Sequence, residues 1–154
     1  MIVTMLGTGS PLPHPDRAGP ATLVQACGLN LLVDCGRGGS MRLAAAGLPA
    51  PLFLHSVLLT HLHSDHITDF NDLVTMQWVM PPVSMPLPVV GPPGTRAFAD
   101  RTIEMLTVDI GYRLAHHADL TWDPAVDVTE VLDGVVDDER FAAAGVTITA
   151  APTD

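Results

Sequence analysis

The sequence contains no lysine, so its seven basic residues are all arginines, against 17 acidic residues and a formal net charge of −10. A protein that holds nucleic acid on a basic surface needs the opposite balance, because binding depends on neutralising phosphate charges. The composition therefore counts against a nucleic-acid partner held by a basic patch. The acidic residues are spread along the chain and are densest in "VVDDERF" (135–141), which indicates a solvated surface.

Long apolar segments and a cysteine framework are also lacking. The longest apolar stretch, "LPAPLFLHSVLLT" (48–60), is too short and too rich in proline to span a bilayer, and "MIVTMLGTGS" (1–10) has no basic region typical of export. We therefore expect a cytoplasmic protein with no membrane association. The two cysteines, Cys27 and Cys35, lie in segments that indicate a hairpin around Gly28 and Leu29, in which the sulfurs would not face each other. We expect both to be reduced and buried.

What is present indicates one α/β domain. The chain has 154 residues, 47% of them hydrophobic, which is enough for a single core, and no repeat or linker divides residues 1–154. Apolar runs bounded by Gly and Pro predict strands, and longer periodic segments predict helices. The expected strands are 2–6, 21–27, 30–34, 56–60, 87–91, 126–132 and 146–150, and the expected helices are 39–49, 66–80 and about 95–106.

The strand at 56–60 leads directly into "THLHSDH" (60–66), which holds three of the seven histidines. At a strand end, residues two apart point the same way, so His61 and His63 could bind one ion together. Asp65 and His66 follow where the chain turns into a helix, and could reach a second ion nearby. Imidazole and carboxylate ligands suit zinc, and with more carboxylate also manganese or iron. The alternative is a set of surface histidines, which this density of ligand-type residues disfavours.

The motif His-x-His-x-Asp-His after an apolar strand resembles the signature of the metallo-β-lactamase superfamily. Five segments, one of which contains this motif, resemble its ribonuclease Z branch in order and spacing: "LGTGSP" (6–11), "DRAGPATLV" (16–24), "LLVDCGRG" (31–38), "LLTHLHSDHI" (58–67) and "VVGPPGT" (89–95). "DIGYRLAHHADL" (109–120) and the terminal "APTD" are most similar to actinobacterial members. The resemblance covers essentially the whole chain.

The resemblance implies an αββα sandwich, of which this chain is about the N-terminal half. It further implies that His61 and His63 hold one zinc ion, and that Asp65 and His66 hold the other. A hydroxide between the ions would then attack a phosphodiester phosphorus, with Asp65 as the catalytic residue that orients it. In this branch a metal-binding histidine follows a stretch such as "APTD". We therefore expect a truncated domain that is inactive alone, and a homodimer in the intact protein.

Residues around the motif each have two alternative roles or a structural one. Asp34 could accept an N–H from the histidine loop, as partners of metal ligands do, or could simply begin a turn. Gly9 and Ser10, in "GTGS", more readily form a tight turn than a ligand contact. Gly94 and Thr95, in "GPPGT", could present backbone N–H groups to an anion at a helix start, or form a turn stiffened by proline. His116 and His117 are adjacent and diverge, so we expect structural roles for them.

Three functions remain open. The first is a ribonuclease Z-like endonuclease that cleaves precursor tRNA near its 3′ end. The second keeps the metal cluster and changes the substrate to a small ester, as in an arylsulfatase-like hydrolase, which the missing lysines favour. The third is a truncated domain without catalysis. Half a sandwich would also leave an apolar sheet face uncovered, and we expect this face to include Leu31, Val33, Leu58 and Val89.

Overall fold

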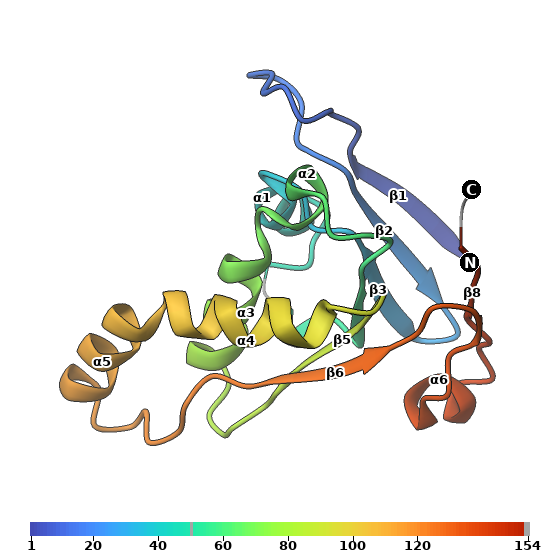
Figure 1. The fold of residues 1–154 in the computed structure, drawn as a ribbon. Coiled ribbons are helices and arrows are strands. Elements are labelled where there is room, and N and C mark those ends of the chain that lie inside the picture. Colours follow the sequence, from blue (N-terminus) through green and yellow to red (C-terminus); the bar gives the residue numbers. More distant parts are fainter. Residues whose placement is uncertain (50, 153–154) are drawn as a thin grey trace.

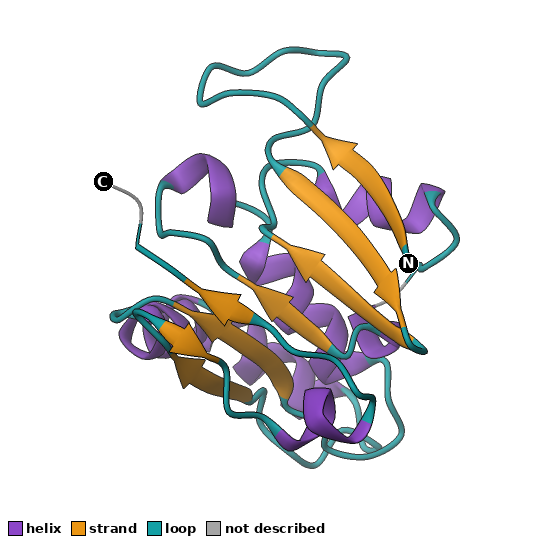
Figure 2. Ribbon diagram, turned by 90° about the vertical axis from the view of Figure 1, so that its right-hand side faces the viewer, coloured by secondary structure: helices purple, strands orange, loops and turns teal. Residues whose placement is uncertain are grey.

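The computed structural model describes residues 1–49 and 51–152, and its main element is a six-stranded sheet with the order β1-β2-β3-β4-β5-β6 (Figure 2). The first three strands pair antiparallel, and the rest of the sheet is parallel. The strands are β1 (Ile2–Gly7), β2 (Ala21–Ala26), β3 (Leu29–Val33), β4 (Ser56–Leu58), β5 (Leu87–Gly91) and β6 (Val126–Glu130). The expected α/β class is confirmed, and so are the positions of these strands to within a few residues.

Helices cover one face of this sheet, and a smaller unit near the end of the described chain lies against the other (Figure 1). The helices are α1 (Gly39–Ala45), the 3₁₀ turn η1 (Pro51–Phe53), α2 (Ser64–Ile67), α3 (Phe70–Val79), α4 (Thr95–Met105), α5 (Thr107–His116) and α6 (Glu139–Ala143). The short strands β7 (Gly134–Val135) and β8 (Thr149–Ala150) pair with each other. None of the helices in residues 1–49 and 51–152 has the length and apolar character that crossing a bilayer requires.

The main core lies between the sheet and its helices. Leu32, Val57 and Val89 point from three neighbouring strands toward Phe70 and Leu73 of α3, and all five are completely buried. Alternation along each strand explains the arrangement, because every second side chain faces the helices.

The opposite face of the sheet differs in two ways from the sequence expectation. Val89 belongs to the helix-covered face, and Val90 replaces it, because Leu58 pairs with Val90 and paired residues share a side. The face is also partly covered, since Phe141 and Val136 pack into one buried cluster with Leu31, Leu58 and Val90. The segment that carries α6 thus shields apolar area that we expected to be open.

The hairpin that joins β2 to β3 turns one residue earlier than expected. Ala26 pairs with Leu29, so the turn consists of Cys27 and Gly28, both with positive φ (50° and 81°). Two-residue turns of this kind match the twist of the strands and favour glycine. Cys35 is buried as expected, whereas Cys27 is exposed at the turn, and both are free thiols.

One helical prediction needs correction, and one helix was not predicted. A single helix over 66–80 was expected, but α2 ends at Ile67 and α3 begins at Phe70, with Asp69 between them. The chain after α4 continues as α5, which has no buried residue and projects from the body of the molecule (Figure 1). Trp78 of α3 is buried, and its indole N–H donates to the Trp122 carbonyl at 2.6 Å.

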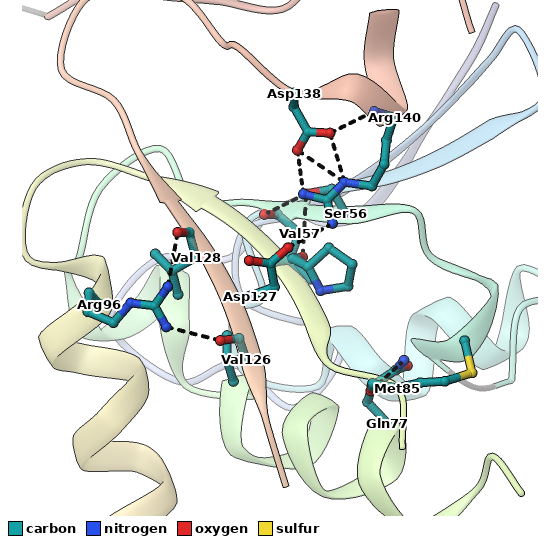
Figure 3. A network of polar contacts seen from close by, with 11 residues as sticks. Ser56, Val57, Gln77, Met85, Arg96, Val126, Asp127, Val128, Asp138 and Arg140 are labelled. Atoms are coloured by element: carbon teal, nitrogen blue, oxygen red, sulfur yellow. Dashed lines mark hydrogen bonds and ion pairs between the residues drawn. The ribbon is translucent and has the colours of Figure 1, made fainter. Parts of the chain in front are cut away.

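Two arginines fix β6 at the edge of the sheet (Figure 3). The Arg96 guanidinium of α4 donates to the carbonyls of Val126 and Val128 at 3.0 and 3.1 Å. Arg140 of α6 pairs with Asp138 and reaches Asp127 of β6 at 3.5 Å. Helices from both sides of the sheet, α4 and α6, are thereby attached to the same edge strand.

Candidate metal centre

The histidine motif lies where the parallel strands β3, β4 and β5 end. In open α/β sheets this carboxyl edge is where ligands bind, because loops from several strands converge there. β4 ends at Leu58, and the motif runs from there through His61 and His63 into α2, which carries Asp65 and His66. His63 stands at the N-cap position of this short helix.

The three imidazole rings form one cluster. The ring centroids of His61 and His63 are 4.7 Å apart with nearly perpendicular planes, and those of His61 and His66 are 4.0 Å apart. The carboxylate Oδ2 of Asp65 lies 3.7 Å from Nε2 of His66. Asp65 is buried, whereas His63 is exposed. The loop therefore brings its three histidines together, with the carboxylate beside one of them.

These donors do not complete a metal site by themselves. In residues 1–49 and 51–152, no three His, Cys, Asp or Glu side chains are arranged so that they could hold one ion. The donor chemistry nevertheless fits zinc, which binds imidazole nitrogen and carboxylate oxygen. The assignment of His61, His63, Asp65 and His66 as ligands therefore stays a prediction.

Asp34 connects the motif to the sheet. It follows β3, is buried, and adopts a left-handed conformation with φ of 58°. Its carboxylate accepts the Thr60 N–H at 2.9 Å and the Thr60 hydroxyl, and Oδ2 lies 2.7 Å from Nδ1 of His66. Because a carboxylate only accepts, this contact places the ring proton of neutral His66 on Nδ1 and leaves Nε2 with a lone pair for a ligand.

Two glycines, Gly19 and Gly36, lie directly against the backbone of the motif, and the sequence did not single them out. A Cβ atom built on Gly36 would lie 2.2 Å from the Asp65 carbonyl oxygen, and one on Gly19 would lie 3.0 Å from the same atom. Backbone hydrogen bonds hold these segments together: the N–H of Cys35 donates to the His66 carbonyl, and that of Gly36 donates to the Pro20 carbonyl, each at 2.8 Å. The glycines in "RAGP" and "DCGRG" are the sequence signal that points to this contact.

The residues expected at an anion site are mostly engaged by the protein itself. The Gly94 and Arg96 N–H groups both donate to Oε1 of Glu130, at 2.9 and 2.8 Å. Thr95 is fully buried and its hydroxyl donates to the Pro92 carbonyl. The carboxylate of Glu130 thus occupies the position at the start of α4 that an anion would favour, and Gly94 and Thr95 do not offer free N–H groups there.

The "GTGS" segment gives a similar result. The Gly9 N–H donates to the Ala18 carbonyl at 2.8 Å, and a Cβ atom on Gly9 would lie 2.7 Å from that oxygen. Gly9 therefore serves a tight backbone contact, and Ser10 beside it is exposed. His116 and His117 lie at the end of α5, where Nδ1 of His116 is 2.7 Å from the Tyr112 carbonyl.

A cleft of about 810 Å³ opens beside the histidines. Thr60, His61 and His63 form its polar end, and most of the rest is apolar, with walls from β4, β5 and residues 131–152. Such a site, with few polar groups at one end of an apolar hollow, suits a ligand held mainly by shape and positioned by the polar end.

The chain resembles known proteins over nearly its whole length. It is 54% identical over 154 residues to a ribonuclease Z of Mycobacterium avium, with 99% of this chain and 53% of that protein covered, and 51% identical to a ribonuclease Z of Mycolicibacterium gilvum. The chain thus spans about half the length of the curated relatives it matches. The expectation of a truncated domain that ends at Asp154 concerns residues outside those that the structure describes.

Solved structures show the same fold. The short form of human tRNase Z matches with a TM-score of 0.60 and 32% identity, over 83% of this chain and 43% of that chain. The metallo-β-lactamase fold protein YhfI of Bacillus subtilis matches with a TM-score of 0.61 and 25% identity, over 88% and 48%.

Fold, motif and relatives define a ribonuclease Z-like protein of the metallo-β-lactamase fold, as the sequence resemblance predicted. A family model described as "Anti-Pycsar protein Apyc1" matches residues 1–86, more than half of the chain. The chain belongs to that family.

Proposed function

We propose that the chain is the part of a metal-dependent hydrolase that carries the histidine motif, and that the intact protein cleaves phosphodiester bonds as a ribonuclease Z-like endonuclease. The observation that carries this proposal is the cluster of His61, His63 and His66 at the sheet edge, with Asp34 behind His66. The identity to ribonuclease Z supports the reaction class. We take residues 1–154 as one domain of this enzyme.

In this proposal His61 and His63 bind one zinc ion, and Asp65 and His66 bind the other, with manganese or iron as alternatives. Bound zinc supplies a nucleophilic water at neutral pH. Asp65, which is buried beside His66, orients that water. Asp34 fixes the ring of His66 and, through Thr60, the start of the loop. The cleft beside His61 and His63 holds the substrate against them.

Two substrate classes are candidates. Precursor tRNA, cut near its 3′ end by a cytoplasmic homodimer, is the first candidate, because the curated relatives are ribonuclease Z. A small ester is the second, and two observations favour it: the net charge of −10 without lysine, and the mainly apolar lining of the cleft. The family model takes its description from an anti-Pycsar protein rather than from a ribonuclease, which is a further reason to test both.

The test uses the full-length protein with zinc, assayed on precursor tRNA and on nitrophenyl phosphate and sulfate esters. Cleavage of precursor tRNA at the 3′ side, lost in Asp65→Ala, would support the first candidate. Turnover of the esters alone would favour the second. If zinc binds to neither the wild type nor the variant, the third hypothesis of a domain without catalysis stands.

A further inference from the structure

Asp69 is a buried carboxylate that no part of the proposed reaction uses. It lies between α2 and α3, three residues after His66, and is 9% exposed. Its Oδ1 accepts the Gly38 N–H at 2.9 Å, and its Oδ2 accepts the Ser40 N–H at 3.0 Å and the Ser40 hydroxyl at 2.8 Å. Three donors at the start of α1 thus converge on one carboxylate from a distant part of the sequence.

These contacts are one end of a longer set that joins residues 34–40 to residues 60–69. At the other end, Asp34 holds Thr60 and His66. Between the two carboxylates, the Cys35 N–H donates to the His66 carbonyl at 2.8 Å, and the Asp69 N–H donates to the Cys35 carbonyl at 2.9 Å. The segment with Asp65 and His66 is therefore fastened before, within and after α2.

The short length of α2 makes these attachments necessary. A helix of four residues has too few internal hydrogen bonds to keep its shape in isolation, so its orientation depends on tertiary contacts. On its N-terminal side the contacts come from Asp34, and on its C-terminal side they come from Asp69. Without the Asp69 carboxylate, the end of α2 would still have the two backbone hydrogen bonds to Cys35, one of which the Asp69 N–H donates, but not the three bonds to the start of α1.

We propose that Asp69 is a positioning residue for the metal centre: by anchoring the end of α2 to the start of α1, it holds Asp65 and His66 in the orientation that binds the ion. The inference rests on the metal centre of the proposed function. It differs from a purely structural role for Asp69, in which the carboxylate caps α1 and contributes only to stability. Gly38, the N-cap residue of α1, has no side chain to do this.

The first experiment compares Asp69→Asn with wild type in the full-length protein, by titrating the metal-free protein with zinc and measuring the dissociation constant. Residues that support metal ligands typically change the affinity by about 10–100-fold when replaced. Because Asp69 acts through the backbone, we expect the lower end, about tenfold weaker binding. Asp72→Asn is the matched control, since it removes the same charge from an exposed position three residues further along the chain, in the first turn of α3.

Ser40→Ala is the second variant, and it remains informative if Asp69→Asn does not fold. It removes one of the three donors and leaves both backbone donors in place, so we expect a smaller loss of zinc affinity in the same direction. In the Asp69→Asn background, Ser40→Ala should change the affinity much less, because its partner is already altered.

A fall in thermal stability with zinc affinity unchanged, within about twofold of wild type, in both Asp69→Asn and Ser40→Ala would overturn the proposal and leave Asp69 as a helix cap. Equal weakening in Asp72→Asn would overturn it as well, because the effect would then be one of charge alone. If the wild type itself does not bind zinc, the metal centre of the proposed function fails, and this inference fails with it. If the wild type binds zinc and Asp69→Asn binds it with the same affinity, only the role of Asp69 is refuted.

Discussion

Replacing Gly36 with alanine should displace the loop that carries the histidine motif without altering any proposed ligand side chain. Gly36 is not one of the glycines with positive φ, so the expected effect of alanine comes from the added methyl group. That methyl would lie 2.2 Å from the Asp65 carbonyl oxygen and 2.7 Å from both the Gly19 carbonyl carbon and the Pro20 nitrogen. All three neighbours are backbone atoms, which cannot rotate away.

The size of the displacement follows from these distances. A contact of 2.2 Å must lengthen to at least 3.0 Å, so the Asp65 peptide and the Gly36 segment must separate by about 0.8 Å. Metal–ligand distances tolerate only about 0.2 Å, and catalytic groups about 0.5 Å. Overpacking of this kind costs about 1–3 kcal/mol of stability, and a cost near the upper value corresponds to a melting temperature lower by roughly 6–12 °C.

The assay pairs zinc titration with thermal unfolding of the full-length protein, and uses Gly111→Ala as the control. Gly111 lies in α5 and a methyl group there meets nothing within 4 Å, so alanine should stabilise the helix by about 0.5–1 kcal/mol. We expect Gly36→Ala to lower both stability and zinc affinity, and Gly111→Ala to leave zinc affinity unchanged. A Gly36→Ala protein that binds zinc like wild type would refute the idea that the close contact of Gly36 and Gly19 with the loop sets the position of Asp65.

Three further changes test the site and its surroundings. Asp65→Ala should leave the full-length protein folded and abolish hydrolysis, and turnover above about a tenth of wild type would contradict its role as ligand and water-orienting group. Asp34→Ala should weaken zinc binding by about 10–100-fold, measured by titration, because His66 loses the partner that fixes its ring. The side-chain hydrogen bonds from Arg140 hold the pKa of Asp138 below its usual value. Asp138→Asn should therefore lower the melting temperature near neutral pH, and the difference from wild type should disappear as the pH falls through the lowered pKa, because a carboxyl with a depressed pKa stabilises only while ionised.

The sequence predicted the sheet and the histidine loop because both are local patterns. Apolar runs such as "SVLLT" form buried strands wherever they are covered, and His61, His63 and His66 are close in space because they are close in sequence. The β2–β3 hairpin was located but misaligned, since the turn required positive φ at Cys27 as well as at Gly28. Positive φ at a cysteine is uncommon, so the sequence favoured a turn one residue later.

The break between α2 and α3 could not be predicted in this way. Apolar residues continue through 66–80 with helical spacing, and no Gly or Pro interrupts them. The helix breaks at Asp69, whose carboxylate accepts three hydrogen bonds from the start of α1. These bonds compensate for the backbone hydrogen bonds that a continuous helix would form. A tertiary contact between segments about 30 residues apart therefore overrides local propensity.

The distinction between local patterns and tertiary contacts also separates the proposed ligands from the residues that position them. His61, His63, Asp65 and His66 form a compact motif in the sequence, as residues proposed to bind shared ions must. The groups that orient the motif act on its backbone, where many sequence positions could serve, so no spacing rule marks them. Asp34 was found through its place at a strand end. Gly19 and Gly36 stand in glycine-containing segments of the sequence, but their contact with the loop, like that of Asp69 with α1, follows only from the distances. A substitution in this supporting set can therefore change metal binding while the motif itself remains intact.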